Sequence, residues 1–510
     1  MTRWGNFTWG DGTLWGQAET NTNLLWALEV DWDGDFTFDG SNEAVRLHRL
    51  ITDRGNEYYL SGDGKGFESN AVGTAVLTLD NYDGRFDPYN TSSPLYGYLR
   101  PGKLIRLWVR NGIGGTDYPV IAGVLQDIKP YGRHGDVDLI LEDGWRWLAD
   151  RNVSVALQGN IYADDAIGAI ADAVTYPWGY ELDTGPDLIK WWWTTGKKAK
   201  TEIENVANSG VGFAFIANNG KLKYYSRQRF DEATMVIRQE HILKDIVLPQ
   251  PWEFQRNIVK IAVQPRVTQS SQDIWTLNDT PSISAGETIY IWAKYTYDNQ
   301  SVPATDVIAP VVTTDYTANA QADGAGADKT ADITVSLTAA NIFAEDAKIA
   351  ITNNDAATVY LTLLKLRGKP INVPNVSEII VEGDDAATLP RALELSLPWQ
   401  QDYNIGVNIA EYLLDFLSSI QYFPTIIIEG RPEIQFALDL NDVVTLQLDE
   451  WGVDANFKIG KIRHRNLSDS CQLIRTEIKL FPVYVPPVDN YWYLGTAGLS
   501  GLGVTTYLGV

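Results

Sequence analysis

Cysteine, histidine and methionine are scarce in this chain of 510 residues, which contains one, four and two of them. The single thiol, Cys471, excludes a disulfide within the chain, and we expect it to be a small buried hydrophobic residue. The histidines (His48, His134, His241 and His464) are scattered, with no HExxH pattern among them. A metal centre built from several histidines is therefore not expected.

Positive charge is also in short supply. The chain has 41 lysines and arginines against 65 aspartates and glutamates, so its formal net charge is −24 and its pI is about 4.6. Stable nucleic-acid binding through a basic face needs Lys and Arg to neutralise phosphates, so this composition argues against it. The same reasoning argues against attachment to an anionic membrane surface.

Long apolar runs are missing as well. Residues 1–10 (MTRWGNFTWG) contain no apolar core of a secretion signal. No apolar run approaches the length of about 18 residues that a membrane span needs. We therefore expect no stable membrane association and a protein that is made and used in water.

Hydrophobic residues make up 45% of the chain and aromatic residues 11%, with 18 tryptophans and 25 tyrosines. This composition predicts packed cores rather than disorder, and the length suggests three or four domains. Strand patterns dominate the sequence. Thr74–Leu79 alternates with a period of two, a turn-rich stretch follows at Asp80–Pro88, and Lys103–Val109 again has a strand pattern.

Helical spacing of apolar residues occurs at Ala163–Val174, at Ala199–Ala207 and at residues 405–420. The first two segments lie within residues 156–250 and predict a compact α+β unit there. After the third, Pro424 ends the helix and a strand is expected over Thr425–Glu429.

Residues 276–372, which include the alternating segment Glu287–Tyr297, predict a β-sandwich. The predicted fold class is therefore mainly β with a smaller α+β part.

Both ends of the chain are rich in glycine and aromatic residues. Residues 1–45 carry a loose Trp-Gly repeat at Trp4, Trp9 and Trp15, and residues 486–510 repeat Tyr-Leu-Gly. Gly, Asn and Thr interrupt every helical pattern in the first segment. One interpretation is an extended arm that becomes ordered against a partner, and a tryptophan platform that stacks on a glycan is the alternative.

Motifs for catalysis are absent from the sequence. It has no GxSxG nucleophile elbow and no GxGxxG or Walker phosphate-binding loop, and nothing selects a catalytic pair from 65 carboxylates. One cluster, Asp31, Asp33 and Asp35, places alternate carboxylates around a Gly turn, as calcium sites do. Its spacing departs from that of the EF-hand loop, so a calcium site and a solvated acidic turn are alternative interpretations of this cluster.

The segment that begins at Val76 has the most specific pattern in the chain. Its sequence is VLTLDNYDGRFDPYNTSSPLY over residues 76–96, and LRPG follows at residues 99–102. This segment resembles the tail hub proteins of long-tailed bacteriophages, minor tail proteins in which a strand precedes such a motif. Glu29–Asp33, Ala347–Lys369 and the two Gly-rich ends are also similar to these hubs, so the resemblance spans nearly the whole chain.

The resemblance implies two barrel-like domains, a peripheral α+β domain and an inserted β-sandwich. The implied division is a Trp/Gly-rich N-terminal arm (1–45), a first β-barrel hub domain (46–155), the α+β peripheral domain (156–250), a second β-barrel hub domain (251–275 and 373–485), the inserted β-sandwich (276–372) and a Gly-rich C-terminal tail (486–510).

The resemblance further implies a structural virion protein of the tail tip or baseplate, assembled in the host cytoplasm. Three copies would form a ring between the sixfold tail tube, or a distal tail ring, above it and a threefold central fibre, spike or tip protein below it. DNA would cross the lumen only as a transient passenger during ejection. No enzymatic residue and no cofactor is implied. The alternative is a carbohydrate-binding or carbohydrate-active β-protein, or a hub with cell-wall hydrolase activity.

Assembly residues are expected in the motif and in the N-terminal arm. Arg85 and Arg100 are rare cations in an acidic setting, and we expect them to pair with Asp80, Asp83 or Asp87. The tryptophans of the arm are expected to contact a neighbouring molecule: Trp4, Trp9 and Trp15.

Overall fold

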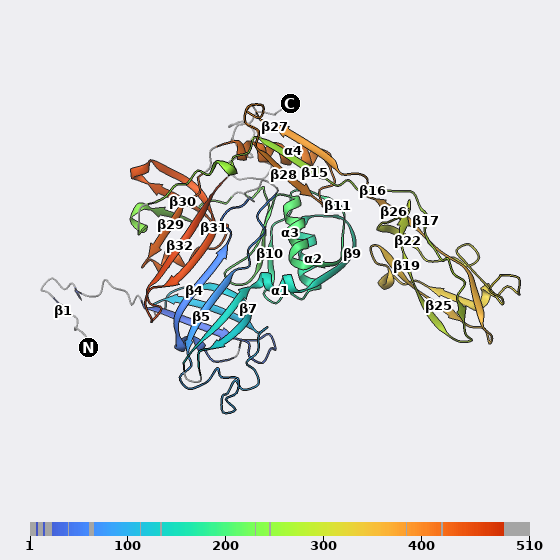
Figure 1. The fold of residues 1–510 in the computed structure, drawn as a ribbon, viewed down its shortest axis with the longest axis horizontal. Helices are drawn as coiled ribbons and strands as arrows, with labels where there is room; N and C mark the ends of the chain where they lie inside the picture. Colours follow the sequence, from blue (N-terminus) through green and yellow to red (C-terminus); the bar gives the residue numbers. More distant parts are fainter. Residues whose placement is uncertain are drawn as a thin grey trace.

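The computed structural model describes residues 7–8, 14–15, 23–38, 40–60, 66–112, 114–132, 135–229, 231–243, 246–383, 385–419 and 422–483. Strands predominate over helices among these residues, which confirms the mainly β fold class. The molecule is elongated, with a large sheet at one end, an α+β unit near the centre and a β-sandwich at the other end (Figure 1). None of the helices in the described residues is long and apolar enough to cross a membrane.

The large sheet has 11 strands, ordered β14-β30-β31-β4-β5-β8-β7-β6-β3, with β32 paired to both β31 and β29. The alternation of apolar side chains along each strand favours this sheet, because one face of a strand is then buried in a shared core. In β5 the buried residues are Ala75, Leu77 and Leu79. Its strands are β3 (Leu24–Val30), β4 (Leu47–Gly55), β5 (Thr74–Asp80), β6 (Leu104–Asn111), β7 (Asp117–Pro130), β8 (Asp136–Asp143), β14 (Met235–Arg238), β29 (Thr425–Glu429), β30 (Val443–Leu448), β31 (Val453–Asn466) and β32 (Ile474–Pro482).

Strand β31, from the late part of the sequence, lies beside β4, from the early part, within this sheet. It pairs antiparallel with β4, and Lys461 lies opposite Gly55. Gly55 has a φ of +88°, and a Cβ there would lie 2.1 Å from the carbonyl oxygen of Gly460, so the pairing requires glycine. Strands of residues 46–155 and of residues 373–485 therefore share one sheet. The division of these segments into two barrel domains remains a prediction.

The α+β unit packs its helices around one apolar core with the indole of Trp192 at its centre, fully buried. Helix α2 begins after Tyr162, whose backbone N–H donates to the carboxylate of Asp165 at 3.0 Å. The elements of the unit are α1 (Gly144–Asp150), β9 (Asn152–Ile161), α2 (Ala163–Ala173), β10 (Tyr180–Leu182), β11 (Ile189–Lys198), α3 (Ala199–Ser209), β12 (Phe213–Ile216) and β13 (Leu222–Tyr225).

A small three-stranded sheet carries the longest described helix. Helix α4 (Tyr403–Ser418) buries Ile409, Leu413 and Leu417 against this sheet. The sheet has the order β27-β15-β28. Its strands are β15 (Ile258–Val263), β27 (Ser377–Glu382) and β28 (Ala392–Leu397), and the short helix α5 (Pro432–Gln435) follows later in the chain.

The β-sandwich is an insertion between β15 and β27 and extends away from the large sheet (Figure 1). One of its sheets centres on β26, and the other has the order β19-β25-β24. Its strands are β16 (Val267–Thr268), β17 (Gln272–Thr276), β18 (Ser282–Ile283), β19 (Thr288–Lys294), β20 (Thr296–Tyr297), β21 (Gln300–Ser301), β22 (Ala304–Ile308), β23 (Tyr316–Asn319), β24 (Ile333–Ser336), β25 (Asp346–Asn353) and β26 (Val359–Asn372).

The remaining elements are short. Near the N-terminus β1 (Phe7–Thr8) pairs with β2 (Leu14–Trp15). Single 3-10 turns occur at η1 (Glu43–Arg46), η2 (Gln239–His241), η3 (Trp252–Phe254), η4 (Thr330–Asp332), η5 (Ala339–Asn341) and η6 (Asp449–Trp451).

Candidate functional site

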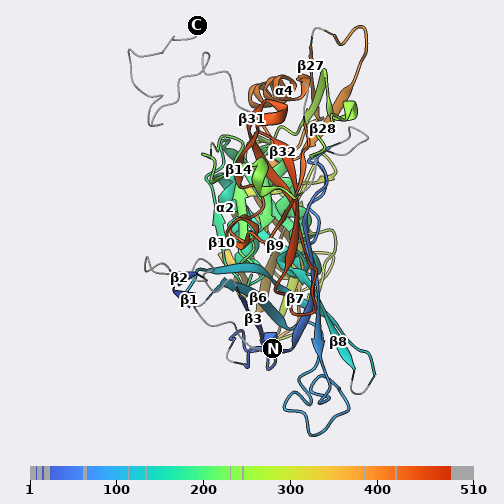
Figure 2. The same cartoon turned by 90° about the vertical axis from the view of Figure 1, so that its left-hand side faces the viewer.

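The segment that carries the sequence motif forms a long loop between β5 and β6, which we call the β5–β6 loop (residues 81–103). The loop, in blue, projects from the lower end of the large sheet (Figure 2). Asp80, just before the loop, and three acidic or amide side chains within it each accept a hydrogen bond from the backbone N–H two residues on, which is an Asx turn. The acceptors and their distances are Asp80 (2.8 Å), Asp83 (3.2 Å), Asp87 (2.9 Å) and Asn90 (3.1 Å).

The same loop is anchored in the core of the large sheet. Phe86 is fully buried, and its ring lies 6.2 Å from that of Trp32. Its backbone N–H donates to the side-chain oxygen of Asn81 at 2.8 Å, and Asn81 is itself fully buried. Ser93 adds a bond of 2.5 Å from its hydroxyl to the carbonyl oxygen of Arg85. The loop is therefore held in one shape although it contains no strand.

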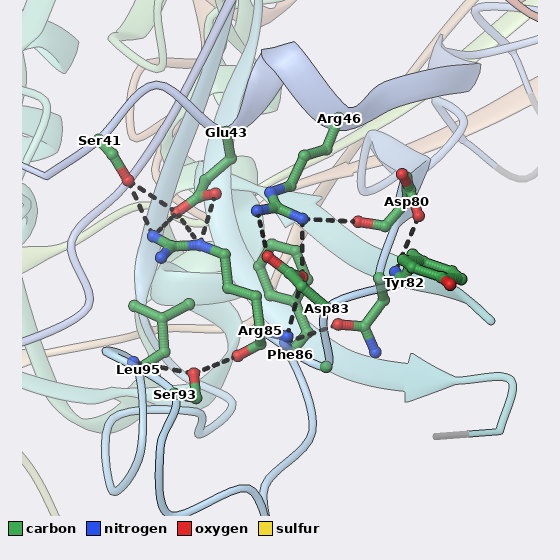
Figure 3. Close-up of polar contacts among 12 residues, drawn as sticks. Ser41, Glu43, Arg46, Asp80, Tyr82, Asp83, Arg85, Phe86, Ser93 and Leu95 are labelled. Carbon is green, nitrogen blue, oxygen red and sulfur yellow. Dashed lines mark hydrogen bonds and ion pairs between the residues drawn. The ribbon is translucent and has the colours of Figure 1, made fainter. Parts of the chain in front are cut away.

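Two ion pairs fasten the β5–β6 loop to η1 (Figure 3). The guanidinium of Arg85 meets the carboxylate of Glu43 at 2.5 and 3.0 Å and also donates to the Ser41 hydroxyl at 2.8 Å. The Glu43 side chain is 2% exposed and that of Arg85 15%. Arg46 binds both carboxylate oxygens of Asp83, at 2.9 and 2.6 Å. This hydrogen bonding lowers the pKa of Asp83.

These contacts correct the expected pairing. Arg85 pairs with Glu43, and not with an aspartate of its own loop, whereas Asp83 pairs with Arg46. Arg100 is exposed and forms no ion pair with any described residue. The partners Ser41, Glu43 and Arg46 were missed, because no pattern in the sequence links residues 41–46 to residues 83–85.

The outer surface of the β5–β6 loop is aromatic. Tyrosines are enriched where proteins contact one another, because the ring contributes apolar area and the hydroxyl stays hydrated. The supported loop is therefore suited to contact with another protein surface. Its exposed tyrosines, with their exposed fractions, are Tyr82 (77%), Tyr89 (89%), Tyr96 (50%) and Tyr98 (48%).

The predicted calcium cluster does come together. One carboxylate oxygen from each of Asp31, Asp33 and Asp35 lies within 4.8 Å of the others. Asp31 is buried, and its two oxygens accept hydrogen bonds from the backbone N–H groups of Gly34, Asp35 and Phe36 at 2.7, 3.2 and 3.1 Å. Burial raises the pKa of Asp31. Asp31 thus organises the turn by itself, and calcium at the cluster remains a prediction.

The tryptophans of the N-terminal arm are only partly within the described residues. Trp4 and Trp9 lie outside them. Trp15 belongs to β2, where it is paired with Phe7 of β1. A role for the three residues in assembly therefore remains a prediction.

A cavity of about 890 Å³ lies where the large sheet, the α+β unit and α4 meet. Burial lowers the pKa of Lys458 on its wall, and the Lys458 ammonium lies 5.7 Å from the ring centroid of Phe213. Burial also raises the pKa of Asp143 to about 7, yet this carboxylate caps α1 and accepts bonds from the N–H groups of Gly73 and Trp145 at 2.8 and 3.0 Å. No pattern in the sequence predicts this cavity, because its walls come from segments far apart in the chain.

Two of the scarce residues, Cys471 and His464, are buried. Cys471 is fully buried, as expected, and burial raises the pKa of its thiol to about 12. His464 is 4% exposed, and its ring nitrogen lies 2.9 Å from the Thr476 hydroxyl.

No family model matches the chain, and no curated protein matches it either. Several solved structures do match it over most of its length. A tail protein from Neisseria meningitidis is 11% identical with a TM-score of 0.48, and the match covers 90% of this chain and 96% of that protein. A 43 kDa tail protein of prophage MuSo2 from Shewanella oneidensis is 10% identical with a TM-score of 0.48, covering 90% and 98%. Prophage tail protein gp18 from Listeria monocytogenes is 9% identical with a TM-score of 0.42, covering 89% and 94%.

Proposed function

We propose that the chain is a structural hub of a phage tail tip or baseplate. The observation that carries the proposal is the segment at residues 76–102, which has the sequence motif of tail hub proteins. In this chain the motif builds a loop that buried Phe86 and the Glu43–Arg85 pair hold rigid while its tyrosines face outward. A rigid aromatic surface loses little conformational entropy on contact, which favours permanent assembly.

The proposed hub is a ring of three copies that joins a sixfold tail tube, or a distal tail ring, to a threefold fibre, spike or tip protein. Subunits in such a ring meet head-to-tail, so each needs two different contact surfaces. The β5–β6 loop is our candidate for one of them, and the N-terminal arm is the candidate for a contact with a neighbour. The two barrel domains, at residues 46–155 and at 251–275 with 373–485, would form the ring wall.

The acidity of the chain suits a channel through which DNA passes. With a net charge of −24, carboxylates on the lumen would repel the phosphate backbone and prevent stable binding. In this proposal the protein is a virion component without enzymatic activity. An image of the assembled ring tests the point directly, and a neutral or basic lumen would contradict it.

A carbohydrate-binding β-protein is the second candidate, and one observation favours it. Trp292 of β19 is more than half exposed, whereas Trp145 and Trp192 are buried in cores. Exposed indoles are what a glycan platform requires. The two functions are compatible if the glycan site lies on a domain outside the ring wall.

The decisive measurement is the mass of the purified full chain by light scattering over a range of concentrations. The hub proposal expects a species of about three times the 56.8 kDa chain mass. Replacing Tyr82 and Tyr89 with Ser should shift this species toward the monomer, whereas the control Tyr403→Ser, at a half-exposed tyrosine on α4, should not. A wild-type chain that stays monomeric at every concentration would contradict the ring.

A further inference from the structure

The outer face of one sheet of the β-sandwich combines aromatic rings with hydroxyl groups. In β19 the side chains of Ile289, Ile291 and Ala293 pack toward the sandwich core. The alternate residues Tyr290 and Trp292 point outward and are 60% and 57% exposed. Two large rings therefore stand side by side on one face of one strand, at a spacing of roughly 7 Å along the strand.

The neighbouring strands set small and polar groups beside these rings. Ala350 of β25 lies directly opposite Tyr290, and Ser336 of β24 lies opposite Ala350. The small side chain of Ala350 therefore lies between the Tyr290 and Ser336 positions on this face, and we call this row of three positions the floor. At the end of the floor the hydroxyls of Thr288 and Thr352 lie 2.8 Å apart and are solvent-exposed.

The rings themselves are fixed in place. Trp292 stacks on Phe343 with ring centroids 5.7 Å apart and planes 25° apart. The ammonium of Lys348 lies 4.4 Å from the ring centroid of Tyr290 and 5.9 Å from that of Trp292. Cation–π contacts of this kind are attractive by about 0.5–1 kcal/mol at exposed sites, so they favour the observed ring positions. The platform is therefore largely pre-organised, which lowers the entropy cost of binding a ligand.

Local charge on this face is opposite to that of the chain. Lys294 and Lys348 project from it against one carboxylate, Asp346, while the whole chain carries −24. Lys348 forms no ion pair with any of the described residues. Its ammonium lies beside the Tyr290 ring, where it can meet an anionic group of a ligand that contacts the same face. The sandwich extends from the rest of the molecule at one end of its long axis, so a large ligand has access to it (Figure 1).

We propose that this face, formed by β19, β25 and β24, binds an acidic polysaccharide of a bacterial cell surface. A sugar ring has an apolar face of C–H groups and an edge of hydroxyls. The C–H face would stack on Tyr290 and Trp292, because the π-face of an aromatic ring is negative and C–H hydrogens are slightly positive. The hydroxyl edge would bond to Ser336 and Thr352, and a carboxylate or phosphate on the sugar would meet Lys348.

The bacterial source rests on the proposed function, whereas the carbohydrate class rests on the face itself. A protein partner fits less well. Contact between proteins would bury the hydroxyl groups and the unpaired Lys348, and each would then need its own partner. A sugar supplies those partners along its whole edge.

The test is an array of purified bacterial polysaccharides, acidic and neutral, probed with the full chain. We expect at least one acidic polysaccharide to bind, and the double variant Tyr290→Ala with Trp292→Ala to weaken that binding roughly tenfold or more. Lys348→Gln should weaken it mainly at low salt, because exposed charges are screened at high salt. The matched control Trp451→Ala removes an equally exposed indole elsewhere, 55% against 57%, and should bind like the wild type.

Three results would overturn the proposal. The first is that no polysaccharide binds the wild type better than it binds the double variant. The second is that binding is independent of Lys348 and equal for neutral polysaccharides. The third is that the double variant changes the oligomeric mass instead, which would make the face a protein contact. Because the array does not require a ring, its failure and the failure of the hub proposal can be told apart.

Discussion

The Glu43–Arg85 ion pair should control the stability of the β5–β6 loop. We consider Glu43→Gln, which keeps the size of the side chain and removes its charge. The Glu43 side chain is 2% exposed and that of Arg85 15%, so the variant leaves a largely buried guanidinium without its counter-charge. Removing one partner of a buried pair typically costs about 3–5 kcal/mol. Because Arg85 retains some exposure and keeps its bond to Ser41, we expect the lower end, about 3 kcal/mol.

The cost should appear as local opening rather than global unfolding. A chain with several packed cores is not expected to unfold in two states, so one melting temperature would not isolate the effect. Hydrogen exchange of peptides covering residues 81–103 measures the opening of the loop itself. A loss of about 3 kcal/mol corresponds to exchange on the order of a hundredfold faster at protected amides. The Phe86 amide is the key reporter, because it is buried and bonded to Asn81.

Two control variants test whether the burial of the Glu43–Arg85 pair, and not merely the loss of an ion pair, causes the effect. Arg110 and Asp117 form a bidentate pair with both contacts at 2.6 Å, but their side chains are 43% and 51% exposed. Asp117→Asn should leave exchange in its own hairpin unchanged. Combining Glu43→Gln with Arg85→Met should restore part of the protection, because no unpaired charge is left buried. Exchange in residues 81–103 of Glu43→Gln within twofold of wild type would refute the reasoning.

Three further predictions concern other parts of the chain. Deleting residues 2–22 should impair incorporation into particles while leaving β3, which begins at Leu24, in its sheet; normal incorporation would contradict a role for the arm. Burial lowers the pKa of His464 to about 3, so its neutral ring stabilises the fold fully above about pH 6.5 and this stability is lost as the pH falls toward 3. Protection of β31 in hydrogen exchange, corrected for the intrinsic exchange rate, should therefore fall less between pH 7 and pH 4 in His464→Gln than in the wild type, and equal falls would count against this. Calcium titration calorimetry should give binding heat that Asp33→Asn with Asp35→Asn abolishes, and identical heats for both proteins would exclude the cluster as the site.

Local structure could be predicted where one periodicity dominates. Residues Thr74–Leu79 alternate strictly, and the observed strand is Thr74–Asp80. The strand predicted at Thr425–Glu429 is confirmed with the same bounds, because Pro424 fixes where it begins. The helix predicted at Ala163–Val174 is Ala163–Ala173 in the structure. In each case the residues that decide the element lie within the element or next to it.

Contacts between distant segments could not be predicted in this way. Nothing near Arg85 in the sequence identifies Glu43 as its partner, since Asp80, Asp83 and Asp87 are all closer along the chain. In the structure these aspartates instead accept backbone hydrogen bonds that shape the loop, and Asp83 also pairs with Arg46. The pairing of β31 with β4 could not be predicted either, because Lys461 and Gly55 lie far apart in the sequence.

The face formed by β19, β25 and β24 shows a third reason why sequence-based prediction falls short. Alternation in Glu287–Tyr297 predicts a strand, but both of its faces are apolar: isoleucine and alanine on one, tyrosine and tryptophan on the other. The alternation of residue types therefore does not determine which face of the strand is buried. In the structure the smaller set faces inward, where Ile289, Ile291 and Ala293 pack in a core that also contains Tyr295, Leu361 and Leu364. The rings are left outside by the same packing that stabilises the sandwich, and a ligand with one apolar face can then use them without any change in the fold.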